Sequence, residues 1–405
     1  MTTTQTGTTA TTGALAGVRV LDLTTLYPGP LATMLLGDLG AEVIRVDAPG
    51  RDDLLRWMPP HGPDGEGALY RMVGRNKRSL ALDLKRPEGR DALLRLCETA
   101  DVLVEQFRPG VLERLGLGWE TLHARCPRLV LCSISAFGQD GPRASRVGHD
   151  IGFLARAGLS AVLGRRQTGP LPLPTLVGDV GGGTWPAVTG ILAALLHRGR
   201  TGLGQHVDIS MTDGALLMNA MVANQALAAG EDAQPEGGWL DGGSFYDYYR
   251  TRDGRFLAVG ALEPKFWSDF LRVIGRTELE PLYLAPGEDG AGCKAAIAET
   301  IAERDLADWA AAFDAVDCCV EPVLTPTEAV ADPLFAARGM VVAVPAEDGS
   351  TAPQIGCPVR LSAAPPRYDH TGPSPGADTR AILAEAGLSE AEIEGLLAAG
   401  VAEAR

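Results

Sequence analysis

Short apolar runs alternate with helical patterns in the first part of the chain. Residues 18–24 (VRVLDLT) form a run rich in β-branched side chains, and residues 42–47 (EVIRVD) repeat that character. Between them, residues 29–40 (GPLATMLLGDLG) have helical spacing, with a proline near the start and a glycine at the end. A strand, a helix and a second strand in this order predict a βαβ unit and therefore a parallel sheet.

The same alternation continues to about residue 138. Strands are expected at 79–84, 101–107 and 129–138, and helices at 87–99 and 119–125. Repeated βαβ units of this kind are typical of an open sheet with helices on both faces. The expected fold class is therefore α/β, with a large, Rossmann-like, parallel-sheet domain.

The character of the sequence changes in the second half. Residues 184–232 are strongly helical in pattern, whereas residues 237–267 are rich in glycine and aromatic side chains, with strand pairs around a hairpin-type turn at Asp253-Gly254. The expected organisation is a disordered Thr-rich tail at 1–16, the first part of the large domain at 17–205, a linker helix at 206–232, a smaller α+β domain at 233–340 and a return to the large domain at 341–405.

Charge and composition narrow the possible partners and location. The chain has 36 basic and 51 acidic side chains and a net charge of −15, which makes a nucleic-acid partner or an anionic membrane surface unfavourable. No window approaches eighteen uncharged apolar residues, and the N-terminus has neither the basic region nor the apolar core of a signal peptide. Seven cysteines without a CxxC pair indicate buried thiols in a reducing compartment. A cytoplasmic location is expected.

Basic residues gather at the ends of the expected strands. The segments 74–90 and 107–118 contain Arg75, Lys77, Arg78, Lys85, Arg108 and Arg114. Strand ends of a parallel sheet form the usual ligand crevice, and guanidinium groups suit phosphate. A solvated basic face explains the same residues equally well. The first turn, LYPGPL at 26–31, lacks the G-x-G-x-x-G pattern of a dinucleotide site, although Asp47 ends the second strand as a ribose-binding acid would.

Four titratable residues stand out from their surroundings. His149 and Asp150 precede a helical stretch, where Asp150 fits a first-turn acid, while capping does not call for a histidine. Asp179 precedes three glycines, where backbone can approach a ligand closely, although a plain glycine turn is an equally open interpretation. Glu263 precedes a proline-started helix, a common arrangement in any protein.

Long motifs in one order resemble the family III CoA-transferase superfamily, and most closely its α-methylacyl-CoA racemase branch. They are GVRVLDLTTLYPGPLATMLLGDLGAEVIRVD, RNKRSLALDLK, FRPGVLERLGLG, GHDI, LVGDVGGG, GQHVDISMTDG, LDGG and DGRFLAVGALEP. The resemblance extends from about residue 14 to 400. It implies a large Rossmann-like domain, a small domain, and two such chains interlocked into a homodimer. The active site then lies between the large domain of one subunit and the small domain of the other. An acyl-CoA thioester is the expected substrate, with no metal and no nicotinamide cofactor.

The resemblance also implies roles for the four titratable residues. Removing the weakly acidic α-hydrogen of a thioester requires a positioned base and a donor to the enolate oxygen. In racemases of this type, the residues that match His149 and Asp179 serve opposite faces of the α-carbon, and the match to Glu263 tunes this pair. The backbone amide at Asp150 holds the enolate oxygen.

The transferase branch gives Asp150 a different role. There the matching carboxylate attacks the acyl-CoA and forms a mixed anhydride, the first step of ping-pong CoA exchange. An anhydride mechanism does not need two opposed proton carriers. His149, Asp179 and Glu263 together therefore favour the racemase, with CoA transfer as the alternative.

Positions that match the family's CoA contacts include Arg75, Lys85 and Arg114, with Leu82 near the adenine. Arg108 belongs to the same basic cluster. An arginine that often follows the second strand in the family is replaced by Ala48, and Arg45 or Arg51 is the candidate to compensate.

Two departures from the family pattern lie near the expected acyl pocket. Gly152 and Phe153 stand where racemases usually have Asn-Tyr. Ser244 and Phe245 begin a segment that is one residue shorter than usual.

Overall fold

A computed structural model describes residues 13–63 and 65–405. Most of the expected disordered tail, residues 1–12, lies outside the described residues. Inside them, the backbone N–H of Leu15 donates to the carbonyl of Leu39 at 2.9 Å, so the chain already packs against the fold before Gly17.

Seven strands form the main sheet, in the order β12-β3-β2-β1-β4-β5-β6. They are β1 (Arg19–Asp22), β2 (Glu42–Asp47), β3 (Lys77–Leu82), β4 (Val102–Glu105), β5 (Val130–Ser135), β6 (His206–Ser210) and β12 (Ala402–Glu403). The first six are parallel, and β12 pairs antiparallel with β3. The order of the parallel strands is that of the doubly wound fold. The expected α/β class with a large parallel-sheet body is confirmed.

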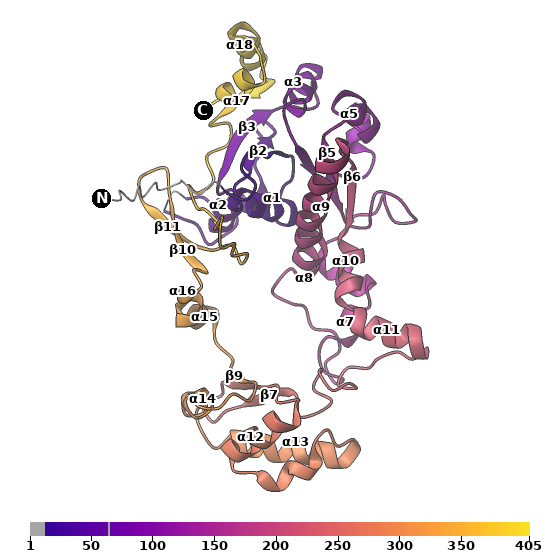
Figure 1. Ribbon diagram of the computed structural model, residues 1–405, viewed down its shortest axis with the longest axis vertical. Coiled ribbons are helices and arrows are strands. Elements are labelled where there is room, and N and C mark those ends of the chain that lie inside the picture. The colour runs from indigo at the N-terminus through magenta and orange to yellow at the C-terminus, as the bar shows by residue number, and fades with distance from the viewer. Residues whose placement is uncertain (1–12, 64) are drawn as a thin grey trace, which may run out of the picture. The chain divides into compact units, whose positions relative to one another are not determined.

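Helices connect most of these strands along the chain, and Figure 1 shows helices beside the sheet. They are α1 (Pro28–Asp38), α2 (Ala68–Val73), α3 (Pro87–Cys97), α4 (Val111–Arg114), α5 (Trp119–Arg125), α6 (Asp150–Arg156), α8 (Val177–Asp179), α9 (Trp185–Thr201), α10 (Met211–Met218), α17 (Thr379–Glu385) and α18 (Glu390–Ala398), with a 3₁₀ turn η1 (Leu54–Arg56) and a π-helical turn η2 (Val180–Thr184). A two-stranded ribbon of β10 (Val341–Pro345) and β11 (Thr351–Ile355) precedes α17.

Local sequence explains the first βαβ unit. Val20 and Leu21 of β1 and Ile44 of β2 are fully buried, as an apolar run covered on both faces of a parallel sheet requires. Pro28 begins α1, where its missing N–H costs no helical hydrogen bond. Gly40 ends the turn after α1 with φ +107°, a conformation that side chains with a Cβ rarely adopt.

The strand order reverses between β1 and β4. Open α/β sheets bind ligands at such a point, beyond the carboxyl ends of the strands. Here the backbone N–H of Gly29, after β1, donates to the Gln106 side chain, after β4, at 3.1 Å. This hydrogen bond closes the two loops over the switch point and brings the start of α1 to the expected ligand crevice.

A three-stranded antiparallel sheet organises the remaining part of the described chain. It contains β7 (Asp247–Arg250), β8 (Phe256–Val259) and β9 (Val320–Pro322). The helices of this part are α7 (Leu159–Val162), α11 (Ala220–Ala229), α12 (Pro264–Ile274), α13 (Gly287–Ile301), α14 (Leu306–Asp314), α15 (Pro326–Ala331) and α16 (Pro333–Ala337), with a 3₁₀ turn η3 (Thr277–Leu282). Trp267, Phe270 and Trp309 are buried in its core. The hairpin expected at Asp253-Gly254 joins β7 to β8.

The chain forms two compact units, whose boundaries differ from the expected ones. The first unit comprises residues up to 156, with Pro174–Met218 and Ala336–Arg405; the second comprises Ala157–Leu173 and Asn219–Phe335. The segment Ala157–Leu173 was expected within the large domain. Arg165 explains its place in the second unit, because its guanidinium pairs with Asp247 of β7 at 2.9 Å.

The linker helix expected at 206–232 is also different. Its first residues, His206–Ser210, form β6, which pairs in parallel with β5, and the helical residues that follow divide into α10 and α11 at Asn219. The strand was missed because the five residues run without a turn signal into a long helical pattern.

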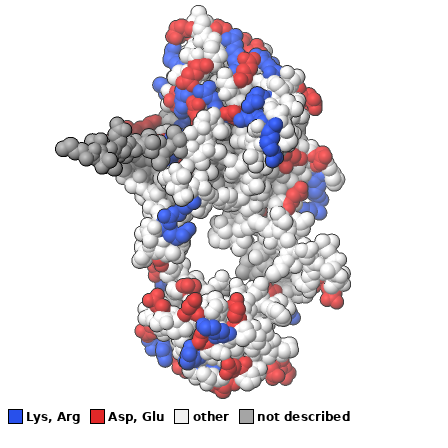
Figure 2. All heavy atoms as spheres, viewed as in Figure 1, with Lys and Arg blue, Asp and Glu red and all other residues white. Residues whose placement is uncertain are grey.

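Charges are mixed over the surface. On the face drawn in Figure 2, acidic and basic side chains are interspersed, and the basic ones form no broad field. Any anion on this face must therefore be held by a local group of cations. Six of the seven cysteines are buried and Cys319 is exposed. Among the described residues, no helix is both long and apolar enough to cross a membrane.

Candidate active site

His149 lies at the end of the long loop after β5, directly before α6. Its side chain is exposed, and its carbonyl accepts the N–H groups of Gly152 and Phe153 at 2.8 and 3.3 Å. Its backbone therefore starts the helix, although its side chain is not of the capping type. This arrangement leaves the imidazole available to a ligand.

Asp150 and Asp179 meet although 29 residues separate them in the sequence. The carboxylate of Asp150, with 7% exposure, accepts the backbone N–H of Asp179 at 2.9 Å. Gly178 permits this approach, because a Cβ there would lie 3.1 Å from Oδ1 of Asp150 and 3.4 Å from Cβ of Phe153. The structure thus brings His149, Asp150 and Asp179 together, and the Asp150 carboxylate serves as a partner of the Asp179 backbone.

The surroundings of Asp179 change its acidity. Burial raises the pKa of Asp179 to about 6; the negative charge of Asp150 adds to this rise, and His149 opposes it. A carboxyl with this pKa can both take up and release a proton near neutral pH. Together with an imidazole, it gives the site two groups suited to proton transfer.

The three glycines after Asp179 form η2 and pack against α10. The sequence had left open either a plain glycine turn or a close approach of backbone to a ligand. A Cβ at Gly182 would collide with the carbonyl of Met211, and a Cβ at Gly214 would collide with Gly182. Small residues are needed here so that two helical segments can approach each other closely.

Tyr27 is a neighbour of the site that the sequence did not reveal. It precedes α1 at the switch point, and burial raises the pKa of its phenol, with the charge of Asp179 adding to the effect. The hydroxyl of Thr184, which ends η2, donates to the carbonyl of Pro28 at 2.8 Å and holds the start of α1 against the Asp179 segment. The turn LYPGPL contains Tyr27, but nothing in its sequence places this residue beside Asp179.

Glu263 lies in the second unit. It is exposed and stands at the N-cap position of α12, where its side chain makes no capping hydrogen bond. Its carbonyl accepts the N–H of Trp267 at 2.9 Å. The first unit, by itself, assembles His149, Asp150 and Asp179 without Glu263.

Three of the expected CoA contacts are interior residues. Arg75 is fully buried; its guanidinium donates to both carboxylate oxygens of Asp38 at 2.9 and 2.7 Å, and to the Ile355 carbonyl at 2.7 Å. Leu82 is buried in β3. Arg45 is 4% exposed and pairs with Asp47 and Asp53 at 2.9 and 3.0 Å. These side chains are engaged inside the fold, and their expected contact with CoA stays a prediction.

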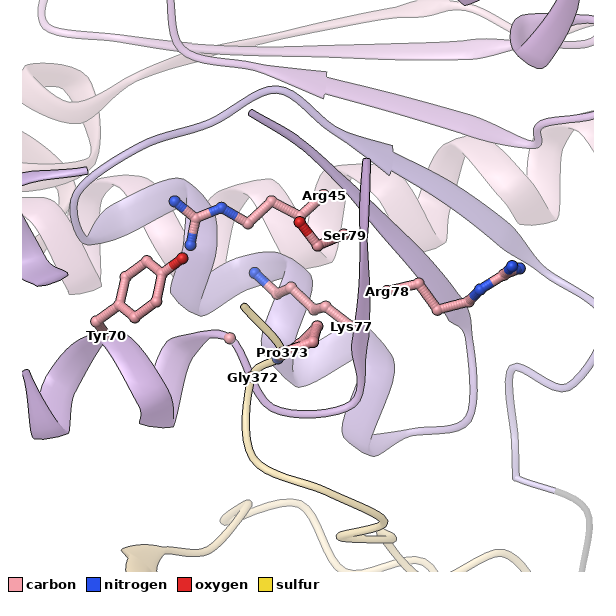
Figure 3. Close-up of a pocket in the computed structure, with 8 residues that line it drawn as sticks. Arg45, Tyr70, Lys77, Arg78, Ser79, Gly372 and Pro373 are labelled. Carbon is pink, nitrogen blue, oxygen red and sulfur yellow. The ribbon is translucent and has the colours of Figure 1, made fainter. Parts of the chain in front are cut away.

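A small pocket beside these residues shows how they are engaged. Arg45, Tyr70, Lys77 and Arg78 line it. In Figure 3, the Arg45 guanidinium lies beside the Tyr70 ring, with 4.8 Å between guanidinium carbon and ring centre, and Arg78 points away from both. Lys77 donates to Asp22 at 2.9 Å. The three cations that line the pocket, Arg45, Lys77 and Arg78, are each paired with a carboxylate. The lining therefore offers no unpaired cation to a phosphate.

The remaining expected cations are exposed. Lys85, Arg108 and Arg114 follow β3 and β4 at the carboxyl ends of the strands, and Arg51 follows β2. Arg45 is paired with carboxylates, whereas Arg51 is exposed. The four exposed side chains remain the candidates for contact with a phosphorylated ligand.

The two departures from the family pattern have a structural explanation. Phe153 is buried and packs edge-on against Phe137, with 6.0 Å between ring centres. Phe245 is buried and stacks on Trp267 at 4.2 Å. Both aromatic rings therefore belong to the core of their own unit, whereas Gly152 is exposed with open space around it.

Solved structures of similar proteins share this fold. A CAIB/BAIF family protein from Brucella suis is 30% identical with a TM-score of 0.81, and the match covers 93% of this chain and 100% of that chain. The Rv3272 protein of Mycobacterium tuberculosis is 29% identical with a TM-score of 0.76, covering 91% and 98%.

Sequence relatives include two kinds of enzyme. The human α-methylacyl-CoA racemase is 39% identical over 383 residues, 94% of this chain and 95% of the relative. The succinyl-CoA–D-citramalate CoA-transferase of Chloroflexus aurantiacus is 34% identical, covering 94% and 96%. The model of CoA-transferase family III matches residues 15–379. This protein is therefore an enzyme of CoA-transferase family III.

Proposed function

We propose that this enzyme is an isomerase that epimerises 2-methylacyl-CoA thioesters by 1,1-proton transfer through an enolate. His149 and Asp179 act as acid and base on opposite faces of the α-carbon. The backbone N–H of Asp150 donates to the enolate oxygen as negative charge develops there. The thioester is the substrate, and the reaction uses no other cofactor.

One observation carries this proposal: the contact between Asp150 and Asp179. A carboxylate that attacks a thioester must be free to reach it, yet the Asp150 carboxylate is buried and accepts the N–H of Asp179. Burial, with the negative charge of Asp150 adding to it, raises the pKa of Asp179 to about 6, which suits a general base. Asp150 therefore fits the role of a partner to a proton carrier better than the role of a nucleophile.

The exposed cations supply the site for CoA. Arg108 and Arg114 follow β4, which borders the switch point, whereas Lys85 follows β3 and Arg51 follows β2. Guanidinium and ammonium groups suit the phosphates of CoA. The net charge of −15 makes such a local cluster necessary.

A homodimer of interlocked chains would complete the site. In this arrangement Glu263, which lies in the second unit, is supplied by the partner subunit and tunes the His149 and Asp179 pair. The first unit supports such an assembly because α10 exposes Leu216, Leu217 and Met218 to solvent. Contiguous apolar side chains of this kind are typical of a surface that a partner covers.

The proposal is tested by NMR of a single epimer of a 2-methylacyl-CoA incubated with the enzyme in deuterated water. The expected result is α-deuterium incorporation together with loss of optical purity, starting from either epimer. The alternative function is tested in the same samples by adding a free carboxylic acid as CoA acceptor. CoA transfer that requires Asp150, without α-exchange, would establish a transferase and overturn the racemase.

The pH profile gives a second expectation. In the direction that uses Asp179 as base, activity is expected to rise with pH through a midpoint near 6, because only the ionised carboxylate accepts a proton. Asp150→Asn keeps an acceptor for the Asp179 N–H but removes a negative charge, so ionisation of Asp179 becomes easier and the midpoint moves to lower pH. Asp140→Asn, in the loop before His149, is the matched control and leaves the midpoint unchanged. A midpoint that stays or rises in Asp150→Asn contradicts the assignment.

A further inference from the structure

The segment from Asp208 to Met218 contacts the chain next to both proton carriers. Its residues 208–214 belong to the motif GQHVDISMTDG, to which the proposed mechanism gives no role. The Thr212 hydroxyl and backbone N–H both donate to the carbonyl of Ala136, at 2.7 and 3.2 Å. The Asp208 carboxylate accepts the backbone N–H of Gln139 at 3.0 and 3.2 Å. Hydrogen bonds of the Thr212 and Asp208 side chains thus hold residues 136–139, the first four after β5, where the loop to His149 begins.

Aromatic contacts connect residues 136–139 to the chain next to His149. Phe137, one of these four residues, packs edge-on against Phe153 of α6. Gly148, the residue before His149, lies on the same two rings, because a Cβ there would be 2.6 Å from Phe153 and 3.5 Å from Phe137. The place of Phe137 therefore determines where the backbone of His149 lies.

The same segment also supports Asp179 from the other side. α10 packs through Met211 and Gly214 against the glycines of η2, which directly follows Asp179. Thr212 stands between these two contact residues. One short element, β6 with the start of α10, therefore fixes the segments that carry His149 and Asp179.

We propose that Thr212 and Asp208 are positioning residues that hold the His149 loop at the correct distance from Asp179. The inference rests on the proposed function, and neither side chain is assigned a contact with the substrate. A two-base proton transfer needs both carriers within hydrogen-bond reach of the same carbon, and a displacement of about 1 Å can cost about 10²-fold in rate. Substrate binding uses other residues, so the effect falls on kcat.

The experiment compares three threonine variants. Thr212→Val keeps the shape and removes the hydroxyl donor, while Thr212→Ser keeps the donor. Thr300→Val is the matched control, since Thr300 is also buried and its hydroxyl donates to a carbonyl, that of Ala296, at 2.8 Å in the second unit. The expected result is a fall in kcat of about tenfold or more for Thr212→Val with KM nearly unchanged. Thr212→Ser and Thr300→Val retain kcat.

A second readout does not depend on turnover. The carboxyl of Asp179 is titrated by NMR of aspartate-labelled protein, with Asp179→Asn to assign its signal. Replacing His149 with Gln is expected to raise the Asp179 midpoint in the otherwise unchanged protein, because His149 lowers the pKa of Asp179. In Thr212→Val this displacement is expected to be smaller, since the two groups are no longer held together.

The outcomes separate the two proposals. If the unmodified enzyme shows no α-exchange, the proposed function fails, and the titration still decides whether Thr212 positions His149. Equal loss of kcat in Thr212→Val and Thr212→Ser, or an unchanged displacement of the Asp179 midpoint in Thr212→Val, would overturn the positioning role. Asp208→Ala, with Asp208→Asn as the variant that keeps an acceptor, is expected to repeat the pattern.

Discussion

Asp179→Asn is expected to reduce racemisation by about 10²- to 10⁴-fold, the range that a positioned acid or base contributes, while exchange of the α-proton persists for one epimer. The asparagine has nearly the same shape but cannot take up a proton. His149 remains, and it can still remove the proton from the face that it serves. The proton then returns to that same face, so deuterium enters the substrate without inversion of the centre.

His149→Gln is expected to give the mirror result. Exchange then persists for the other epimer, whose α-hydrogen faces Asp179, and inversion is again lost. The measurement is NMR in deuterated water on each pure epimer separately, with optical purity determined in the same samples. Asp213→Asn, an exposed carboxylate on α10, is the control that leaves both activities unchanged.

Complementary exchange is the signature of two bases on opposite faces. If both variants lose exchange from both epimers equally, His149 and Asp179 do not divide the faces between them. If both variants retain full racemisation, neither residue is a proton carrier. The Asp150→Asn profile then shows whether the Asp150 carboxylate itself is required.

The sequence predicted the large sheet because the apolar runs of the strands and the helical spacing between them are both local features. Each expected strand from 18–24 to 129–138 overlaps an observed one, and the helix expected at 119–125 has the observed bounds. Apolar runs and helical spacing are set by neighbouring residues, so they can be read without a structure. The sequence did not predict the strand β6, because its partner, β5, is about 70 residues away and its own sequence continues into a helical pattern.

The candidate site was predictable in its residues but not in its contacts. His149 was found because capping does not call for a histidine, and Asp179 was found because glycines follow it and the resemblance assigns it a role. The hydrogen bond from the Asp179 backbone to Asp150 depends on how α6 packs on α8, which is long-range information. Tyr27 was missed for the same reason, since only the fold brings the first turn to Asp179.

The basic cluster shows where composition alone misleads. Arg75 and Lys85 lie ten residues apart in one positively charged segment, and sequence cannot tell which of them faces solvent. In the structure Lys85 is exposed, while Arg75 meets Asp38 at the end of α1 and the ribbon strand β11. Burial and partners therefore decide whether a cation serves a ligand or the fold.

Arg75→Met is expected to destabilise the protein strongly, by about 3–5 kcal/mol, with little effect on KM for an acyl-CoA. The change leaves Asp38 as a buried carboxylate without its ion-pair partner. Burial already raises the pKa of Asp38, so the unpaired carboxyl is relieved by protonation. The loss of stability is therefore larger at pH 8 than at pH 5, because a group with a raised pKa loses its stabilising proton as the pH rises.

Urea unfolding at both pH values, together with KM for an acyl-CoA, measures the two effects separately. Arg380→Met is the control, because its pair with Glu394 lies on the surface and contributes little. The double variant Asp38→Leu/Arg75→Met removes the unpaired charge and is expected to recover part of the lost stability, although Asn76 also loses its hydrogen bond to Asp38. A higher KM for the acyl-CoA with unchanged unfolding would instead indicate that Arg75 binds CoA. A residue that contacts a phosphate of CoA contributes to binding, whereas an interior ion pair contributes to folding.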